Sequence, residues 1–387
     1  MSYPRVPIGD LVSLRQGFAI NKNTKHHISD ESTALPLLRI ADMKDKVQNV
    51  FVKDTIPAHF IAKPEDIIYT RTGQVGLVFT DQYGVIHNNC FTVTPNDAKT
   101  LNRYYLYYVL QSEDFYSAAN NLASGAAQPD LPHGAFRSIE IPVPPLASQM
   151  RIAEILKGYD DLIENNQKQI KLLEEAAQRL YKEWFVDLRF PGHETTPIVD
   201  GVPEGWKEQS LYQIADVVMG QSPKSEYYNQ VGEGLPFHQG VGSYGNRFVS
   251  DETYSTSFTR IAEAGSILFS VRAPVGRLNL TKNKVVIGRG LAAINHRRRA
   301  QSYLFYLLKE KFFRDDIIGN GSIFASISKE ELLNQKFLIP IDSLVGQFNG
   351  IAGGIDKKID ILSEQIRLLT EARNRLLPKL MSGEIEV

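Results

Sequence analysis

The feature that most constrains this fold is a helix-like segment that occurs twice in the chain. The segment "IKLLEEAAQRL" occupies residues 170–180, "IRLLTEARNRL" occupies residues 366–376, and seven of the eleven paired positions are identical. The two copies stand 196 positions apart (366 − 170) in a chain of 387 residues. Repetition over such a distance predicts a duplicated architecture rather than a single continuous domain.

The stretches that precede the two helical segments also repeat, in the same order. The segment "KPEDIIYTRTGQVGLV" (63–78) matches "EAGSILFSVRAPVGRL" (263–278) in its pattern of apolar and turn residues. Gly76 and Gly276 occupy the same place in this pattern, 200 positions apart (276 − 76). We therefore predict an α/β fold in which a globule and a long helix are followed by a second globule and a second long helix.

This repeat divides the chain into four segments. We assign residues 1–146 to a first globule, 147–190 to a central long helix, 191–341 to a second globule with a linker at 191–205, and 342–387 to a C-terminal long helix. The two globules share a pattern of apolar and turn residues, whereas the two helices share identical residues at many positions. This contrast is typical of two modules that recognise different things on a common frame, and simple surface divergence of duplicated domains would produce it too.

Apolar residues recur in both helical segments at alternating steps of four and three. Such heptad spacing predicts that each helix packs along another helix, and the simplest partner is the other copy. We favour antiparallel pairing in a coiled coil, because it places one globule at each end and makes the chain pseudo-two-fold symmetric. The residues predicted to form this pairing are Ile163, Asn166, Ile170, Leu173 and Leu180 in the first helix and Ile359, Leu362, Ile366, Leu369 and Leu376 in the second.

Two polar residues interrupt the apolar seam of these helices. Asn166 and Arg373 either fix the register of the pair at a cost in stability or lie partly exposed, and the sequence favours neither interpretation. Ser148 and Ser343 are the candidate N-caps of the two helices. Pro378 is expected to kink or end the second helix, because proline lacks the backbone N–H that a helix interior requires.

Composition narrows the class of protein. The chain is 43 % hydrophobic and 22 % charged, which is an ordinary globular balance. Cys90 is the single cysteine, so an intramolecular disulfide is excluded and a zinc site is disfavoured. Neither a secretory signal nor a run of about eighteen apolar residues is present. We therefore expect a cytoplasmic protein with no membrane contact.

Sequence motifs for catalysis are absent or incomplete. The chain contains no NPPF- or DPPY-like stretch, no GxxxxGK[ST] loop and no HExxH. "GVGSYG" (240–245) has the form of GxGxxG, but extended sequence follows where a dinucleotide site needs a helix. "PDLPHGAFRSIEIP" (129–142) has a Pro-Asp and a later Glu but lacks a lysine at nuclease spacing. We predict a non-catalytic chain that binds no metal or cofactor.

The layout resembles the specificity subunit of type I restriction–modification systems. The resemblance covers nearly the whole chain and is carried by "IPVPPLASQMRIAEIL" (141–156), "LIENNQKQIKLLEEAAQRLYKEWF" (162–185) and "QIRLLTEARNRLLPKLMSGEI" (365–385). It implies two target-recognition globules that each read one half of a bipartite double-stranded DNA site. It also implies that the helices set the spacer and dock methyltransferase subunits, two in number, together with restriction/translocase subunits. S-adenosylmethionine, ATP and Mg are then expected in those partner subunits.

Loops in the two globules supply the side chains that this function would need. Arg, Lys, Asn, Gln and Ser reach base edges, while other cationic and small polar groups contact phosphates. We treat Arg71 and Arg272 as equivalent residues of the two globules; a solvated surface loop explains any single residue equally well. The candidate DNA-binding residues are Arg71, Thr72, Gln74, Ser124 and Gln128 in the first globule and Gln239, Ser243, Tyr244, Asn246, Arg247, Arg272, Ser322 and Ser326 in the second.

The net charge of the chain is −1, whereas a free-standing DNA-binding domain is usually strongly basic. If a partner subunit encloses the duplex, phosphate neutralisation is shared and local basic loops suffice. A different class of function also fits: a non-catalytic coiled-coil scaffold whose globules bind proteins. A concealed enzyme would require converging carboxylates or a nucleophile–base pair that the sequence does not reveal.

Overall fold

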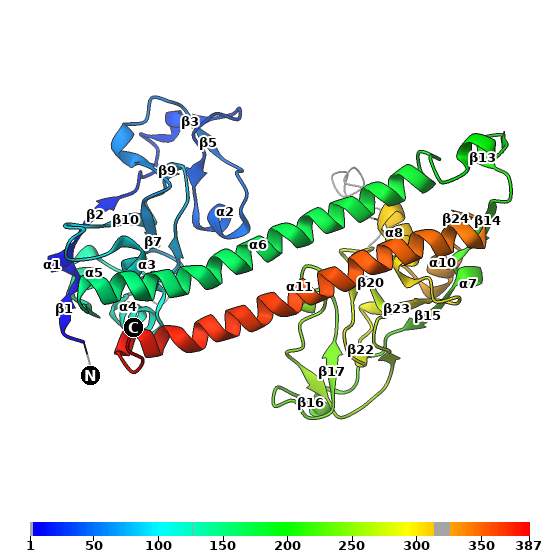
Figure 1. Cartoon of the computed structure of the whole chain (residues 1–387). Coiled ribbons are helices and arrows are strands. Elements are labelled where there is room, and N and C mark those ends of the chain that lie inside the picture. The colour runs from blue at the N-terminus through cyan, green and yellow to red at the C-terminus, as the bar shows by residue number, and fades with distance from the viewer. Residues whose placement is uncertain (1–2, 126, 313–325) are drawn as a thin grey trace. The chain divides into compact units, whose positions relative to one another are not determined.

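The computed structural model describes residues 3–125, 127–312 and 326–387 (Figure 1). The chain forms two compact units. The first contains the residues up to 166 together with 365–387, and the second contains 167–364. Each long helix is therefore divided between the two units, whereas the division made from sequence treats each helix as one segment.

The first unit contains a globule of short strands and helices that precedes the first long helix. Its strands are β1 (Arg5–Pro7), β2 (Val12–Gln16), β3 (Ile28–Ser29), β4 (Leu37–Leu38), β5 (Phe51–Val52), β6 (Ile61–Ala62), β7 (Ile67–Thr70), β8 (Val78–Phe79), β9 (Gly84–Ile86), β10 (Cys90–Pro95) and β11 (Glu140–Pro142). Its helices are α1 (Ile8–Leu11), α2 (Ile40–Asp45), α3 (Arg103–Gln111), α4 (Glu113–Leu122) and α5 (His133–Ser138). Asn102 caps α3 by accepting from two backbone N–H groups of its first turn.

The second unit contains the other globule. Its strands are β12 (Ile198–Val199), β13 (Val202–Pro203), β14 (Lys207–Ser210), β15 (Ala215–Met219), β16 (Tyr228–Asn229), β17 (Leu235–His238), β18 (Tyr254–Ser255), β19 (Ile261–Ala262), β20 (Ile267–Ser270), β21 (Leu278–Leu280), β22 (Val285–Ile287), β23 (Leu291–His296) and β24 (Lys336–Ile339). Its short helices are α7 (Leu211–Ile214), α8 (Gln301–Phe312) and α10 (Lys329–Leu333).

The two globules share one topology, which confirms the predicted duplication. Strands β2-β10-β7-β8 form an antiparallel four-stranded sheet in the first, and β15-β23-β20-β21 form the same sheet in the second. Part of a second sheet also recurs: β4 pairs in parallel with β9 in the first globule, and β17 pairs in parallel with β22 in the second. The central strands β7 and β20 are buried along their whole length, including the polar residues Thr70 and Ser270 at their ends.

The long helices are α6 (Leu146–Phe185) and α11 (Asp342–Ser382). Each contributes one part to each unit. In the first unit, Leu156 of α6 and Leu380 of α11 belong to one core with the globule; in the second, Tyr181 of α6 and Phe348 of α11 do the same. Each unit therefore repeats one plan: a globule, the first part of the helix that follows it, and the last part of the other long helix.

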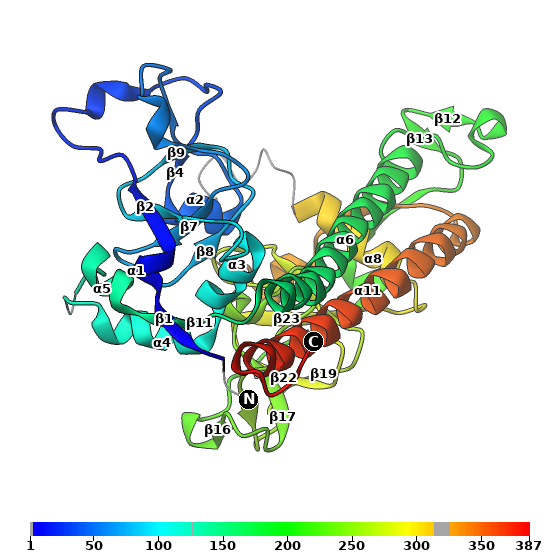
Figure 2. The same cartoon turned by 60° about the vertical axis from the view of Figure 1, so that its left-hand side comes forward.

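The two helices run antiparallel within each unit, as predicted. In the first unit Asp160 contacts Arg373, and Asn166 contacts Gln365. Residue numbers therefore rise along α6 as they fall along α11. In the second unit the ring of Tyr181 packs 5.7 Å from that of Phe348. Figures 1 and 2 show the two helices side by side in each unit. None of the ten predicted pairing residues is exposed, and Asn166, Ile359 and Leu362 are buried.

The predicted ends of the helices need correction. The helices begin at Leu146 and Asp342, so Ser148 and Ser343 lie inside them rather than at the N-caps. Helix α11 continues through Pro378 to Ser382, where Leu380 and Met381 are buried in the core of the first unit. Burial of these side chains offsets the proline penalty of about 3 kcal/mol, because tertiary packing rather than propensity supplies most helix stability in proteins.

Candidate nucleic-acid interface

The turn between β7 and β8 is built on Thr70. The backbone N–H of Gly76 donates to the carbonyl oxygen of Thr70 at 3.1 Å, and the N–H of Leu77 donates to the Thr70 hydroxyl oxygen at 2.9 Å. That hydroxyl donates in turn to the carbonyl of Gln74. Gly76 has φ 98°, and a Cβ there would lie 2.5 Å from the ring of Tyr116, so this position requires glycine.

The turn between β20 and β21 repeats this geometry. Gly276, with φ 89°, donates to the carbonyl of Ser270 at 3.0 Å, and the N–H of Arg277 donates to the Ser270 hydroxyl oxygen at 2.8 Å. The Ser270 hydroxyl donates to the carbonyl of Pro274 at 2.6 Å. Positions 70–77 and 270–277 therefore correspond with an offset of 200.

This offset corrects the predicted equivalence of Arg71 and Arg272. The carbonyl of Arg71 accepts from Leu131 at 3.0 Å, and the carbonyl of Val271 accepts from Ile327 at 2.9 Å. Arg71 thus corresponds to Val271, which is buried in the core of the second unit, and Thr72 corresponds to Arg272. Because successive side chains of an extended segment point to opposite sides, a shift of one residue sends the two arginines in different directions.

Arg71 lies in a polar cluster that joins the turn to the loop before α5. Its Nε donates to Oδ1 of Asp130 at 3.2 Å and its Nη2 donates to Oδ2 at 2.7 Å, while Nη1 donates to Oε1 of Gln16 at 3.2 Å. The Thr72 hydroxyl also donates to Asp130. Hydrogen bonding from Arg71 holds the pKa of Asp130 below its usual value, so the carboxyl is ionised at neutral pH.

The remaining candidates of the first globule are exposed. Gln74 lies on the β7–β8 turn, and Ser124 and Gln128 lie on the loop that ends at Asp130. Ser124 pairs with Asp130 through two backbone hydrogen bonds of 2.8 and 2.9 Å, which hold this loop beside Thr72. The structure therefore brings Arg71, Thr72, Ser124 and their two loops together.

Arg272 is exposed in the second unit and shows no polar partner among the residues that the structure describes. Its backbone forms a bridge with Ser326, as Thr72 does with Asp130. Arg272 and Ser326 are thus neighbours at this turn. The other candidate of that segment, Ser322, lies outside the described residues.

The glycine-containing loop after β17 presents some candidates and holds others internally. Asn246 and Gln239 are exposed, and Gln239 accepts from the Ser222 hydroxyl at 2.7 Å. Ser243 instead contacts Nδ1 of buried His238 at 2.9 Å. The hydroxyl of Tyr244 is buried, and burial raises the pKa of this phenol. The loop therefore presents fewer polar groups to solvent than its sequence indicated.

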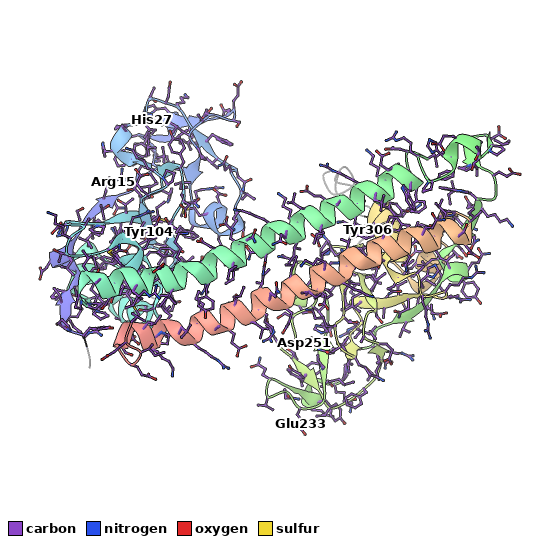
Figure 3. The ribbon with its side chains drawn as sticks, in the orientation of Figure 1. Arg15, His27, Tyr104, Glu233, Asp251 and Tyr306 are labelled. Atoms are coloured by element: carbon purple, nitrogen blue, oxygen red, sulfur yellow. The ribbon has the colours of Figure 1, made fainter. Side chains whose placement is uncertain are left out.

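The predicted DNA contact at Arg247 needs correction. Its side chain is 3 % exposed, and its guanidinium lies over the ring of Phe305, 3.9 Å from the centroid. It forms an ion pair with Asp356 of α11 and lies 3.8 Å from Glu174 of α6, beside Tyr306 of α8 (labelled in Figure 3). Arg247 therefore attaches the loop to the long helices within the second unit instead of facing a ligand.

Sequence reasoning missed Asp130 and Gln16. Asp130 belongs to the Pro-Asp pair of an incomplete nuclease motif. Gln16 is the last residue of β2, and its Nε2 donates to the carbonyls of Asn88 and Cys90 at 2.6 and 3.3 Å. The signal that could have found both is the duplication itself. Where the first globule has Arg71, Gln16 and Asp130, the second has Val271, Met219 and Ser326, so the three polar residues change together.

Comparison with known proteins decides what these paired globules belong to. The family model described as "Type I restriction modification DNA specificity domain" matches the chain twice, over residues 3–175 and 203–373. The chain belongs to the type I restriction–modification specificity family. Each match covers one globule and a large part of the long helix that follows it, so the family's repeat coincides with the structural duplication.

Relatives of this specificity subunit match it over most of their length. A putative MjaX specificity subunit from Methanocaldococcus jannaschii is 32 % identical over 97 % of this chain and 91 % of its own length. The HindI specificity subunit from Haemophilus influenzae is 20 % identical over 84 % and 87 %. The crystal structure of an S subunit from M. genitalium has the same fold, with a TM-score of 0.63 and 17 % identity over 98 % and 96 % of the two chains.

The described part of the specificity subunit lacks two further features. Residues 3–125, 127–312 and 326–387 contain no cluster of three or more His, Cys, Asp or Glu side chains arranged to hold a metal ion. Within those same ranges, no helix has the length and apolar character needed to cross a membrane.

Proposed function

We propose that this chain recognises a bipartite double-stranded DNA target, with one half-site contacted by each globule. The observation that carries the proposal is the pair of equivalent turns, β7–β8 and β20–β21, each with the loop segment that bridges to it. The two share one backbone geometry and carry different side chains. Arg71, Thr72 and Asp130 stand in the first, where Val271, Arg272 and Ser326 stand in the second. A common frame with different contact groups is what recognition of two unrelated half-sites requires.

The partners follow from the family. The chain would dock two methyltransferase subunits along the long helices and associate with restriction/translocase subunits in the cytoplasm. S-adenosylmethionine, ATP and Mg would be bound by those partners. A methyltransferase that encloses the duplex would share phosphate neutralisation with a chain whose own net charge is −1.

Exchange of one globule tests this function. Residues 205–340 are replaced by the matching segment of a relative, so that β14 and β24, which pair with each other, are exchanged together. Methylated positions are then mapped in cells that express the hybrid with the cognate methyltransferase. One half-site should change and the other should remain. A simultaneous change in both halves contradicts separate recognition, and absence of sequence-specific methylation by the unmodified complex favours a protein-binding scaffold.

A further inference from the structure

The Arg71 guanidinium has a defined hydrogen-bonding capacity left over. An arginine carries five N–H hydrogens, one on Nε and two on each terminal nitrogen. Asp130 takes one from Nε and one from Nη2, and Gln16 takes one from Nη1. One N–H on each terminal nitrogen remains. The bonds to Asp130 and Gln16 hold the guanidinium in position, and the side chain is 21 % exposed, so it remains partly accessible.

The bases differ in what they offer to two such donors. In the major groove, guanine presents two acceptors, O6 and N7. Adenine presents one acceptor beside an amino donor, cytosine presents an amino donor, and thymine presents one acceptor beside a methyl group. A pair of N–H groups on one rigid guanidinium therefore matches guanine better than any other base.

The charges around Arg71 favour contact with a base over contact with a phosphate. The carboxylate of Asp130 is 37 % exposed beside Arg71, so the pair presents one positive and one negative group to an approaching ligand. A phosphate would meet the repulsion of this carboxylate, whereas a neutral base edge would not. Gln16 is itself held through two backbone carbonyls and adds no charge.

From this geometry we propose that Arg71 contacts a guanine in the half-site of the first globule, with Asp130 and Gln16 as positioning residues that orient its guanidinium. The proposal rests on the proposed function, since it assigns a base to a DNA contact. It applies to the first globule alone. Val271 and Met219 occupy the positions of Arg71 and Gln16 in the second globule, so the other half-site must be recognised differently.

The test uses the complete complex with its methyltransferase. Methylation mapping first gives the target, and the globule exchange assigns its first half-site. Binding is then measured to duplexes in which each guanine of that half-site is replaced in turn by adenine or by 7-deazaguanine, which lacks N7. In the unmodified complex, adenine at one guanine should weaken binding by roughly 5- to 140-fold, and 7-deazaguanine should weaken it at the same position. Arg71→Ala should bind all these duplexes equally at that position.

Asp130→Asn tests positioning. The asparagine keeps the side-chain shape but has one acceptor oxygen, so discrimination between guanine and adenine should fall toward that of Arg71→Ala. Binding to non-target DNA should not fall, because a negative charge is removed. The matched control is Asp66→Asn, which breaks the 2.7 Å Arg15–Asp66 ion pair of the same globule and should leave the discrimination unchanged.

Three results would overturn the inference. These are a first half-site without guanine, full discrimination retained by Arg71→Ala, and full discrimination retained by Asp130→Asn. Each requires that the unmodified complex methylates a specific bipartite site. If the unmodified complex does not methylate a specific site, the proposed function itself is contradicted. Failure of the guanine proposal and failure of the proposed function are therefore distinguishable.

Discussion

Arg373 of α11 donates from Nη1 to Oδ1 of Asp160 of α6 at 2.5 Å, within the first unit. The other oxygen of Asp160 accepts from the Tyr108 hydroxyl at 2.6 Å, so this carboxylate joins both long helices to the globule. Asn166 likewise donates to Gln365 of the opposite helix at 3.3 Å. Both polar residues of the apolar seam thus contact the partner helix, which favours the hypothesis that they set its register.

Replacement of Arg373 by methionine should destabilise the first unit. Asp160 would keep only its bond from Tyr108 while remaining about a quarter exposed, and loss of a hydrogen bond to a charged group costs about 1.5–3 kcal/mol. Denaturant unfolding of the purified chain measures this change. Arg375→Ala is the control, because its ion pair with Glu371 is far more exposed and should contribute less than about 1 kcal/mol. Equal losses from the two variants would contradict a role in register.

Arg247→Leu should destabilise the second unit by about 3–5 kcal/mol, because it leaves the half-buried carboxylate of Asp356 without its ion pair. The control is Lys282→Ala, which removes the 2.7 Å ion pair between Lys282 and Asp360 of α11. This pair is more exposed, and its loss should cost about 0–1 kcal/mol. Unfolding curves of both variants provide the comparison. Unchanged stability of Arg247→Leu together with weaker DNA binding would restore Arg247 as a DNA contact.

Arg272→Ala should weaken DNA binding without changing stability by more than about 0.5 kcal/mol, because this side chain is exposed. The salt dependence of binding identifies its target. A phosphate contact predicts weaker binding to all sequences and a log–log salt slope shallower by about 0.9, whereas a base contact predicts a loss of about 1–3 kcal/mol confined to the second half-site. DNA binding that is unaffected in both respects would exclude Arg272 from the interface.

Lowering the pH should lower the free energy of unfolding of the first globule, because Asp42 becomes protonated. Hydrogen bonds from Arg39 and Asn49 hold the pKa of this buried carboxyl below its ordinary value of 3.8. Since the folded pKa is the lower one, the stabilisation is fully present above the unfolded pKa and is lost as pH falls through the folded pKa. Asp42→Asn should therefore be less stable than the unmodified chain at pH 7, and the difference should shrink below about pH 4. A difference in unfolding free energy that is constant from pH 7 to 3 would contradict this.

The long helices can be tested as determinants of spacer length. Because they are antiparallel, a heptad must be inserted at facing positions, after Asn166 in α6 and before Gln365 in α11, which contact each other. Insertion after Leu173 and after Leu369, which match in the sequence repeat, would misalign the Asn166–Gln365 contact between them. Each heptad adds about 10 Å, or about three base pairs, and rotates the far half-site by about a third of a DNA turn.

One inserted heptad should therefore abolish binding to the original target. Three should partly restore it for a spacer about nine or ten base pairs longer, since they add about 31 Å and a DNA turn is about 34 Å. Binding of the assembled complex to duplexes with graded spacers measures this. If the one-heptad variant still prefers the original spacer, the helices do not set the distance.

The sequence by itself determined the duplication, the order of globules and helices, and the pairing of the two long helices with each other. These follow from periodic patterns that extend over many residues: the heptad steps, the buried apolar strands, and the turn that needs glycine at both 76 and 276. Such patterns are local consequences of helix and strand geometry, so they can be recognised without knowledge of the partner surface.

Tertiary structure decided which polar side chains remain available. Arg71 and Arg247 looked alike in sequence as loop arginines, but one is paired with Asp130, 59 positions away, and the other is buried against Asp356, 109 positions away. Loops have no periodicity that assigns a side chain to a face. The carboxylate that each arginine meets depends on chain segments brought together only by folding, and the balance of burial and charge at that contact decides whether a side chain supports the fold or faces a ligand.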